Sequence, residues 1–530
     1  MSELSRAQNA GRNILFGGLL KLYQIIMPFV LRTCMIYFMG VEYLGLNSLF
    51  VSILQVLNLV ELGVGNAMVY SMYKPISEAD HPTLCALLRL YRSYYRIIGL
   101  LVAAIGLALL PLVPHLVAGS VPNGLNLQVL YLLNLCATVL SYWLFAYKTS
   151  LLQAHQRSDV VSKVMLLTNT VMYAVQIAVI VAIKDYYLYV IVTLAAQALT
   201  NIAGAVCATK LYPHLKPVGS LSKAQIALIN QRIKDLFTSK MGGAVFGAGS
   251  TLVISAFLGL TSLAVYQNYY YIVTSVSSIV GVVFSACMAG IGNSIITETK
   301  EKNFRDFGTF TFILIWVIGF CACCVLALCQ PFMELWVGKD LMLEFFAVVC
   351  FTLYFFIYNM TSMLCTYKDA AGIWHEDRYR PLTTSVANIA LSILLVIPLG
   401  IYGVALATPL SQAIIGVPWL LRNLFTYLFA TSMMKPYLKK LACYILLAIV
   451  GCGICYAICS AVTLAPAQAI VFRGAVCLVL YNAFYLACTF RSDVFRSSLK
   501  TIQQVLKRGI RPREARQDAR EDSDEPLRGE

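Results

Sequence analysis

Residues 309–330 read TFTFILIWVIGFCACCVLALCQ, an uninterrupted run without a charged side chain. A bilayer core is crossed by about 20 apolar residues in an α-helix, which rises about 1.5 Å per residue. The core of a soluble domain cannot bury runs of this kind repeated along a whole chain. The stretch therefore predicts a membrane-spanning helix.

About fourteen such stretches follow one another along the 530 residues, of which 59% are apolar and 12% charged. They cover residues 13–39, 45–72, 93–117, 126–148, 164–183, 186–208, 239–260, 263–291, 309–330, 342–366, 380–399, 402–421, 441–462 and 468–490. Each is apolar over about 20 residues, whereas the strands of a membrane β-barrel alternate over about 10. The predicted fold class is an all-α, polytopic membrane protein with about fourteen transmembrane helices.

The positive charges fall almost entirely into every second gap between the predicted spans. Of the 40 Lys and Arg residues, only Lys184 and Lys339 lie in the other gaps, and Lys21, Arg32 and Arg473 lie inside spans. Because cytoplasmic loops carry an excess of Lys and Arg, both chain termini are predicted to be cytoplasmic. The net charge of +15 is thus a sign of topology, and no nucleic-acid partner is expected.

Several classes of function find no support in the sequence. Most of the 17 cysteines lie inside apolar spans without histidines at ligand spacing, so we expect free thiols and no metal site. There is no Walker motif and no constellation of catalytic residues. We expect neither an enzyme nor a cofactor.

An internal duplication relates the first six predicted spans to the next six at a shift of about 220 residues. Residues 38–40 (FMG) correspond to residues 257–259 (FLG), and Tyr147-Lys148 corresponds to Tyr367-Lys368. Because six is an even number, the copies enter the membrane from the same side and should be related by a pseudo-two-fold axis along the membrane normal. Two such six-helix lobes enclosing a cavity are typical of alternating-access transporters.

The predicted organisation follows from this duplication. It comprises an N-terminal lobe (1–208), a cytoplasmic linker (209–238), a C-terminal lobe (239–425), two additional C-terminal helices (426–490) and a cytoplasmic amphipathic helix with an acidic tail (491–530).

Deep charges are candidate functional groups because an ionisable side chain in hydrocarbon is costly unless it faces water or a partner. Arg32 and Lys21 in the first span are interpreted as cavity cations for an anionic substrate, and Glu61 in the second as an ion-coupling site. In the alternative interpretation Arg32 pairs with Glu61 as a structural bridge, and Lys21 extends toward the cytoplasmic headgroups.

Amide and phenol side chains are concentrated on the second and eighth spans. They are suited to hydrogen bonding with a hydroxyl-rich ligand, although contacts between helices would use the same groups. The candidates for such a polar cavity are Gln55, Asn58, Gln267, Asn268 and Tyr270.

With these features in place, the chain resembles the Wzx-type polysaccharide flippases, in the superfamily that also holds the multidrug and toxin extruders. Four stretches carry the resemblance, which extends over most of the chain: FMGVEYLGLNSLF (38–50), ELGVGN (61–66), YKPISEAD (73–80) and DRYRP (377–381). In related lipid-linked sugar flippases, cavity positions match Arg32 and Glu61.

The resemblance implies a flippase that moves undecaprenyl-pyrophosphate-linked oligosaccharides from the inner to the outer leaflet of the bacterial plasma membrane. It further implies a proton or sodium gradient as energy source, and a polysaccharide polymerase and assembly proteins as partners. An ion-coupled small-molecule or multidrug exporter of the same fold is the first alternative. A membrane-embedded polymerase or glycosyltransferase is the second, although the loops offer little room for its chemistry.

Overall fold

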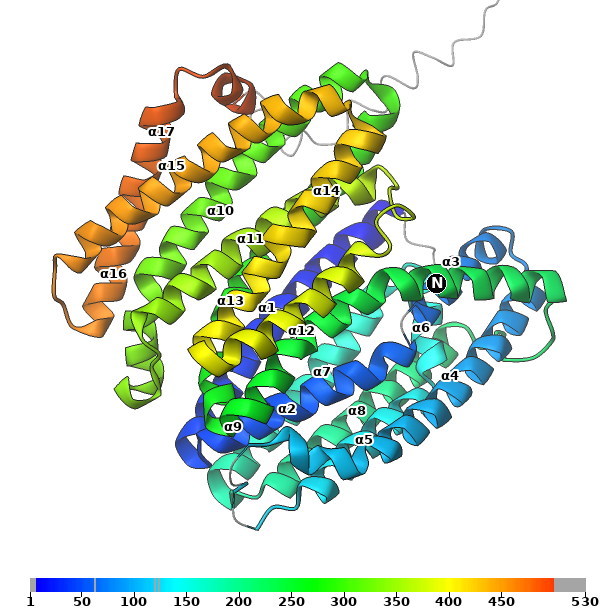
Figure 1. Cartoon of the computed structure of the whole chain (residues 1–530). Coiled ribbons are helices and arrows are strands. Elements are labelled where there is room, and N and C mark those ends of the chain that lie inside the picture. Colours follow the sequence, from blue (N-terminus) through cyan, green and yellow to red (C-terminus); the bar gives the residue numbers. More distant parts are fainter. Residues whose placement is uncertain (1–5, 62, 119–120, 123, 500–530) are drawn as a thin grey trace, which may run out of the picture.

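The structure, a computed structural model, describes residues 6–61, 63–118, 121–122 and 124–499. These residues form helices joined by short loops, and contain no β-strand (Figure 1). The all-α class predicted from the sequence is confirmed. The α-helices are α1 (Arg6–Phe38), α2 (Val41–Leu57), α3 (Val64–Ser77), α4 (His81–Leu109), α5 (Leu127–Trp143), α6 (Ala146–Ala154), α7 (Ser158–Ala178), α8 (Tyr186–Leu211), α9 (Lys223–Thr297), α10 (Lys300–Val337), α11 (Phe345–Ala370), α12 (Arg380–Leu399), α13 (Ile401–Ser411), α14 (Val417–Asn423), α15 (Met434–Ser460), α16 (Pro466–Val476) and α17 (Asn482–Thr489).

Within the described residues, eleven helical segments are long and apolar enough to cross a membrane, or twelve if α5 and α6 form one bent span. The multi-pass membrane class is confirmed, whereas the predicted count of fourteen is not. When α5 and α6 are counted as one span, two of the fourteen predicted spans remain to be explained. One is missing because the apolar helix α2 is shorter than the helices counted as spans. The other is missing because a single region of α9 covers two predicted spans and is counted once.

Helix α9 reverses its direction at Gly259, which has a positive φ of 82° and a non-helical ψ of 179°. The amide nitrogen of Gln267 donates a hydrogen bond to the hydroxyl of Thr251 at 2.8 Å. In a straight helix these two residues would be about 24 Å apart. The two arms of α9 are therefore antiparallel and correspond to the predicted spans 239–260 and 263–291.

The predicted span 45–72 is not one continuous helix. Helix α2 ends at Leu57, the 3₁₀ turn η1 (Asn58–Glu61) follows, and α3 begins after Gly63, which has a φ of 92°. Broken helices at membrane depth are tolerated where the freed backbone is enclosed by protein or lines a cavity. The break places Asn58 and Glu61 at such a position.

A second break lies between α5 and α6, whose axes differ by 52°. Phe145 stands at this bend in the left-handed region, with a φ of 58°. The hydroxyl of Tyr142, at the end of α5, donates to the side-chain oxygen of Asn58 in η1 at 2.7 Å. The two broken spans of the N-terminal half thus meet at their breaks.

The N- and C-terminal halves contact each other near the outer end of α1, as the predicted topology defines it. The indole of Trp336, at the end of α10, donates to the hydroxyl of Thr33 at 2.7 Å, and its carbonyl accepts from Tyr37 at 2.7 Å. Its ring stacks on Phe29 with a centroid distance of 4.5 Å. Helix α1 is therefore attached to α10 at this end.

A second contact between the halves uses backbone groups at the same end. The N–H of Ala118 donates to the carbonyl of Ser255 at 2.9 Å, and the hydroxyl of Ser255 donates to the carbonyl of Leu116 at 2.6 Å. Helix α2 also packs along the first arm of α9. Hydrogen bonds thus join the two halves both at the outer end of α1 and beside the reversal of α9.

The last two predicted spans pack against α10, and Figure 1 shows α15, α16 and α17 grouped beside it at one edge of the molecule. The indole of Trp316 donates to the side-chain oxygen of Asn482 at 3.0 Å, and Arg473 donates to the carbonyl of Ala327 at 3.0 Å. Of the predicted amphipathic segment after Phe490, residues 493–499 are helical, and the rest lies outside the described residues.

Replacing Gly259 by alanine should destabilise the protein. The added Cβ would adopt an unfavourable φ and lie 2.7 Å from the carbonyl oxygen of Ala118. A strained residue of this kind costs about 1–3 kcal/mol, so thermal unfolding in detergent should begin at a lower temperature. Gly243→Ala on the same helix is the control, since a Cβ there has no atom within 4 Å. Equal unfolding temperatures for the two variants would contradict the proposed role of Gly259.

Candidate functional site

The Glu61 carboxylate lies in a group of tyrosines in the N-terminal half. The hydroxyl of Tyr95 donates to Oε1 of Glu61 at 2.6 Å. Tyr91 donates to Tyr95 at 3.0 Å and lies 3.0 Å from the hydroxyl of Ser150. The chain of hydroxyls leads from the break in the second span to α6.

Asn58 belongs to the same region, because its partner Tyr142 packs against Tyr95 with ring centroids 5.6 Å apart. A Cβ atom at Gly65 would lie 3.2 Å from the hydroxyl of Tyr91, so the tyrosines approach the α3 backbone closely. A carboxylate in contact with a tyrosine hydroxyl can bind a proton or a small hard cation. The sequence proposal for Glu61 as an ion-coupling residue is compatible with this arrangement.

Arg32 lies at the boundary between the two halves. Its guanidinium donates to the side-chain oxygen of Asn268, on the second arm of α9, at 3.4 Å. Its Cζ atom is 4.9 Å from the ring centroid of Tyr271, whose hydroxyl donates to the carbonyl of Ile25 in α1. The contacts of Arg32 thus differ from the tyrosine contacts of Glu61, and the structure gives no support to an Arg32–Glu61 bridge.

Asn268 is fully buried, and its side-chain nitrogen has no hydrogen-bond partner among the described residues. A buried amide donor without a partner costs about 1–3 kcal/mol. Asn268 therefore presents an unused donor beside the arginine at the boundary of the two halves.

A small polar cavity lies between the two arms of α9. Its volume is about 10 Å³, near the lower limit for one water molecule. The lining residues are Phe246, Gly247, Ser250, Thr251, Tyr266, Gln267, Tyr270, Tyr354 and Thr408. Gln55 of α2 adjoins this cavity, because a Cβ atom at Gly247 would lie 3.0 Å from its side-chain nitrogen.

The predicted site residues therefore fall into three groups. Arg32 and Asn268 form one, Gln55, Gln267 and Tyr270 adjoin the small cavity, and Asn58 and Glu61 share the tyrosine cluster. Lys21 is exposed on α1 and has no ion pair within the described part of the chain.

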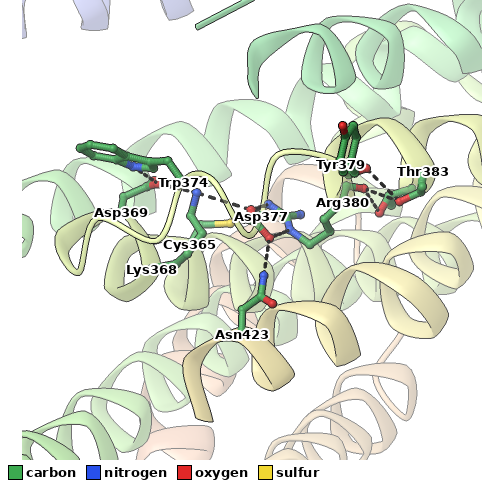
Figure 2. Close-up of polar contacts among 10 residues, drawn as sticks. Cys365, Lys368, Asp369, Trp374, Asp377, Tyr379, Arg380, Thr383 and Asn423 are labelled. Atoms are coloured by element: carbon green, nitrogen blue, oxygen red, sulfur yellow. Dashed lines mark hydrogen bonds and ion pairs between the residues drawn. The ribbon is translucent and has the colours of Figure 1, made fainter. Parts of the chain in front are cut away.

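A buried charge network at the start of α12 is shown in Figure 2. Asp377 accepts from Arg380 through both carboxylate oxygens at 2.8 Å, and its Oδ2 lies 3.4 Å from Nζ of Lys368. The side-chain nitrogen of Asn423, in α14, donates to the same carboxylate at 3.2 Å. Lys368 also forms an ion pair with Asp369 at 2.6 Å. The network ties α11, α12 and α14 together.

A related arrangement occurs in the N-terminal half. Asp159, at the start of α7, is buried and pairs with Arg157 at 3.0 Å and with Lys163 at 3.6 Å. Nearby, burial lowers the pKa of His155, which packs on the ring of Tyr212 at 4.1 Å. Both halves thus have a buried aspartate held by two cations where a predicted cytoplasmic loop enters a helix.

Sequence reasoning noted Asp377 and Arg380 only within the stretch that resembles the flippases. It missed Asn423 as a partner of Asp377, and it missed Tyr95 and Tyr142 as partners of Glu61 and Asn58. The Asp-x-x-Arg spacing at the start of a helix was a usable signal for the ion pair. Contacts between distant helices have no comparable signature in one sequence.

The described residues thus form a bundle of broken and antiparallel helices, with polar groups at the boundary of two halves, which is the fold of a multi-pass membrane protein. Comparison with solved structures agrees. A structure described as lipid II flippase MurJ in an inward closed conformation aligns over 89% of this chain and 98% of its own, with a TM-score of 0.65 and 16% identity. An inward-facing MATE family multidrug transporter of the MOP superfamily aligns over 79% and 99%, with a TM-score of 0.61 and 13% identity. At these identities the likeness shows the fold.

The model of one sequence family matches residues 10–289, just over half of the chain. The chain belongs to this family, which is described as polysaccharide biosynthesis protein. The predicted resemblance is confirmed at the level of the family, and the fold is shared with structures described as a lipid II flippase and a multidrug transporter. A search of curated proteins found no match.

Removing the guanidinium of Arg380 should destabilise the C-terminal half, because it takes a hydrogen-bonded cation from a buried carboxylate. The expected cost for Arg380→Ala is about 3 kcal/mol, seen as an earlier thermal transition in detergent. Lys339→Ala is the control, since Lys339 pairs with Glu334 at the surface and is 79% exposed. An Arg380→Ala protein as stable as this control would show that Lys368 alone can compensate the carboxylate.

Proposed function

We propose that the protein flips undecaprenyl-pyrophosphate-linked oligosaccharide units from the inner to the outer leaflet of a bacterial plasma membrane. Both chain termini would lie in the cytoplasm, as the distribution of Lys and Arg indicates. The family and the fold support this class of activity. The substrate would supply surface polysaccharide assembly, with a polymerase and assembly proteins acting next.

The main support for this proposal is the hydrogen bonding of Arg32. A guanidinium has five N–H donors arranged to bind phosphate oxygens, and within the described structure Arg32 donates one hydrogen bond, to Asn268. The other donors are available to a pyrophosphate. Because Arg32 lies where the two halves meet, an anion bound there would contact both of them.

The polar side chains around the small cavity would bind the sugars. Gln267, Tyr270 and Gln55 present amide and hydroxyl groups, which can exchange their present partners for sugar hydroxyls. A cavity of about 10 Å³ has no room for a sugar. The proposal therefore requires the two halves to separate from each other when substrate enters.

Glu61 would couple this movement to an ion gradient. Binding of a proton or a sodium ion at the carboxylate would change its hydrogen bond with Tyr95, and hence the contacts between the two broken spans. Since the tyrosine cluster links α4, α5 and α6 to the second span, this change would reach most of the N-terminal half. Lys21 is proposed as a second cation for the substrate, nearer the cytoplasm.

An exporter of small molecules is the second candidate. The tyrosine rings at the small cavity favour it: Tyr266 stacks on Tyr270 at 5.9 Å, and Tyr270 contacts Tyr354 at 5.7 Å. Aromatic linings suit apolar or cationic drugs. The two functions differ in the substrate that crosses the membrane, so a transport assay with each substrate separates them.

Arg32→Ala should strongly slow the flipping of a fluorescent undecaprenyl-pyrophosphate oligosaccharide in liposomes that contain the purified protein. A charge-assisted hydrogen bond contributes about 1.5–3 kcal/mol, so we expect a rate reduced about tenfold or more. Arg473→Ala is the matched control, because Arg473 is also an intramembrane arginine but lies in α16, outside the duplicated spans. Equal loss in both variants, or flipping retained by Arg32→Ala, would contradict the role of Arg32. Absence of flipping by the wild type together with transport of a small cation would favour the exporter.

Glu61→Gln should uncouple flipping from the gradient. Glutamine keeps an acceptor for Tyr95 but does not ionise. The variant should therefore respond neither to a proton gradient nor to a sodium gradient, whichever drives the wild type. Glu42→Gln, at the start of α2, is the control and should retain the full response. A response of Glu61→Gln equal to that of the wild type would place the coupling site elsewhere.

A further inference from the structure

A groove follows the end of the twelfth predicted span, alongside α14 and the two π-helical turns that flank it, η5 (Gln412–Gly416) and η6 (Leu424–Leu428). Its volume is about 540 Å³, which is within the range of binding sites for small organic ligands. The described lining consists of Ile414, Ile415, Pro418, Trp419, Arg422, Asn423, Thr426 and Tyr427.

The lining residues form two rows with a strict spacing of four, beginning at Ile414 and at Ile415. In a regular α-helix a spacing of four drifts by about 40° per turn, so such a row would wind away from one face. A π-turn accommodates an extra residue and offsets this drift. The two π-turns thus keep both rows on one face, from the apolar Ile414 to the polar Thr426.

Chemical character changes along the groove. Ile414, Ile415 and Pro418 form its apolar part, Trp419 and Tyr427 add aromatic rings, and Arg422 supplies a positive charge. Arg422 is exposed and has no ion pair with a carboxylate in the described part of the chain. By contrast, the nearby cations Lys368 and Arg380 are neutralised by Asp377.

The position of Arg422 relative to Asp377 is fixed by a buried contact. Asn423, the next residue and itself part of the lining, donates to the Asp377 carboxylate at 3.2 Å (Figure 2). This bond ties the groove to the charge network.

The groove lies at a membrane surface according to the sequence. The span 402–421 ends at the cytoplasmic side in the predicted topology, and exposed lysines follow at the start of α15: Lys435, Lys439 and Lys440. Tryptophan and tyrosine are enriched at this depth, where headgroups meet acyl chains. Basic residues there attract the anionic lipids of the cytoplasmic leaflet.

We propose that this groove is a binding site for an anionic phospholipid of the cytoplasmic leaflet. The lipid phosphate would accept hydrogen bonds from Arg422, the headgroup would contact Asn423 and Thr426, and an acyl chain would lie along Ile414, Ile415 and Pro418. The site is distinct from the proposed substrate contact at Arg32. It does not depend on the flippase function, because it requires only the predicted topology.

The test is lipid retention by the full-length protein, measured by native mass spectrometry after titration with phosphatidylglycerol or with zwitterionic phosphatidylcholine. The wild type should bind one phosphatidylglycerol in preference to phosphatidylcholine. Arg422→Gln should lose this preference by about fivefold, the effect of one basic residue near an anionic surface. Arg422→Lys should restore part of it. Lys210→Gln, which removes the same charge from an exposed position at the end of α8, is the control and should behave as the wild type.

Three outcomes would overturn the proposal. In the first, Arg422→Gln binds phosphatidylglycerol like the wild type. In the second, Lys210→Gln loses as much preference as Arg422→Gln, which would show diffuse attraction to a basic surface. In the third, inorganic phosphate at equal concentration displaces the lipid completely, which would show an anion site without a place for acyl chains. Thermal unfolding of each variant checks that a loss of binding is not a loss of fold.

Discussion

Lipid offers no hydrogen bonds to a polypeptide, and the rest of the structure depends on this constraint. Every backbone N–H and C=O in the hydrocarbon region needs a partner inside the protein, so the chain consists of long helices. Where a helix breaks, the protein supplies replacement partners. The breaks after Leu57 and at Phe145 meet through Tyr142 and Asn58, and the reversal at Gly259 lies against Ala118. The polar side chains of the candidate site lie close to these irregular points.

Charged side chains also need partners inside the protein, and two kinds of partner occur. At the predicted cytoplasmic ends, Asp159 and Asp377 are each held by two cations, so their charge is compensated and serves to join helices. In the membrane interior, Arg32 has an amide and an aromatic ring as neighbours, and Glu61 has a tyrosine hydroxyl. The contacts of Arg32 can be replaced by a ligand without leaving an opposite charge unpaired.

The sequence predicted the fold class well, because uninterrupted apolar runs of about 20 residues, repeated along a chain, are typical of membrane helices alone. It also identified Arg32 and Asn268, which contact each other, since deep polar residues are rare. It did not show that the second span breaks at Asn58, although Gly63 and Gly65 follow closely in the stretch 61–66. The reason is that a break depends on partners such as Tyr142, 84 residues away. A bridge between Arg32 and Glu61 was reasonable on charge alone, but the helices bring each residue to different partners.

The backbone of α9 is continuously helical from Lys223 to the reversal at Gly259. At helical rise its length is about 54 Å, whereas the hydrocarbon core is about 30 Å thick. The first part of this helix therefore extends beyond the membrane, where Arg232 contacts Ser71 and Tyr70 of α3. The far end meets Ala118 at the opposite surface. One helix thus contacts α3 near its first end and Ala118 at the reversal, and we expect a movement of α3 to be passed along this helix to the contact with Ala118.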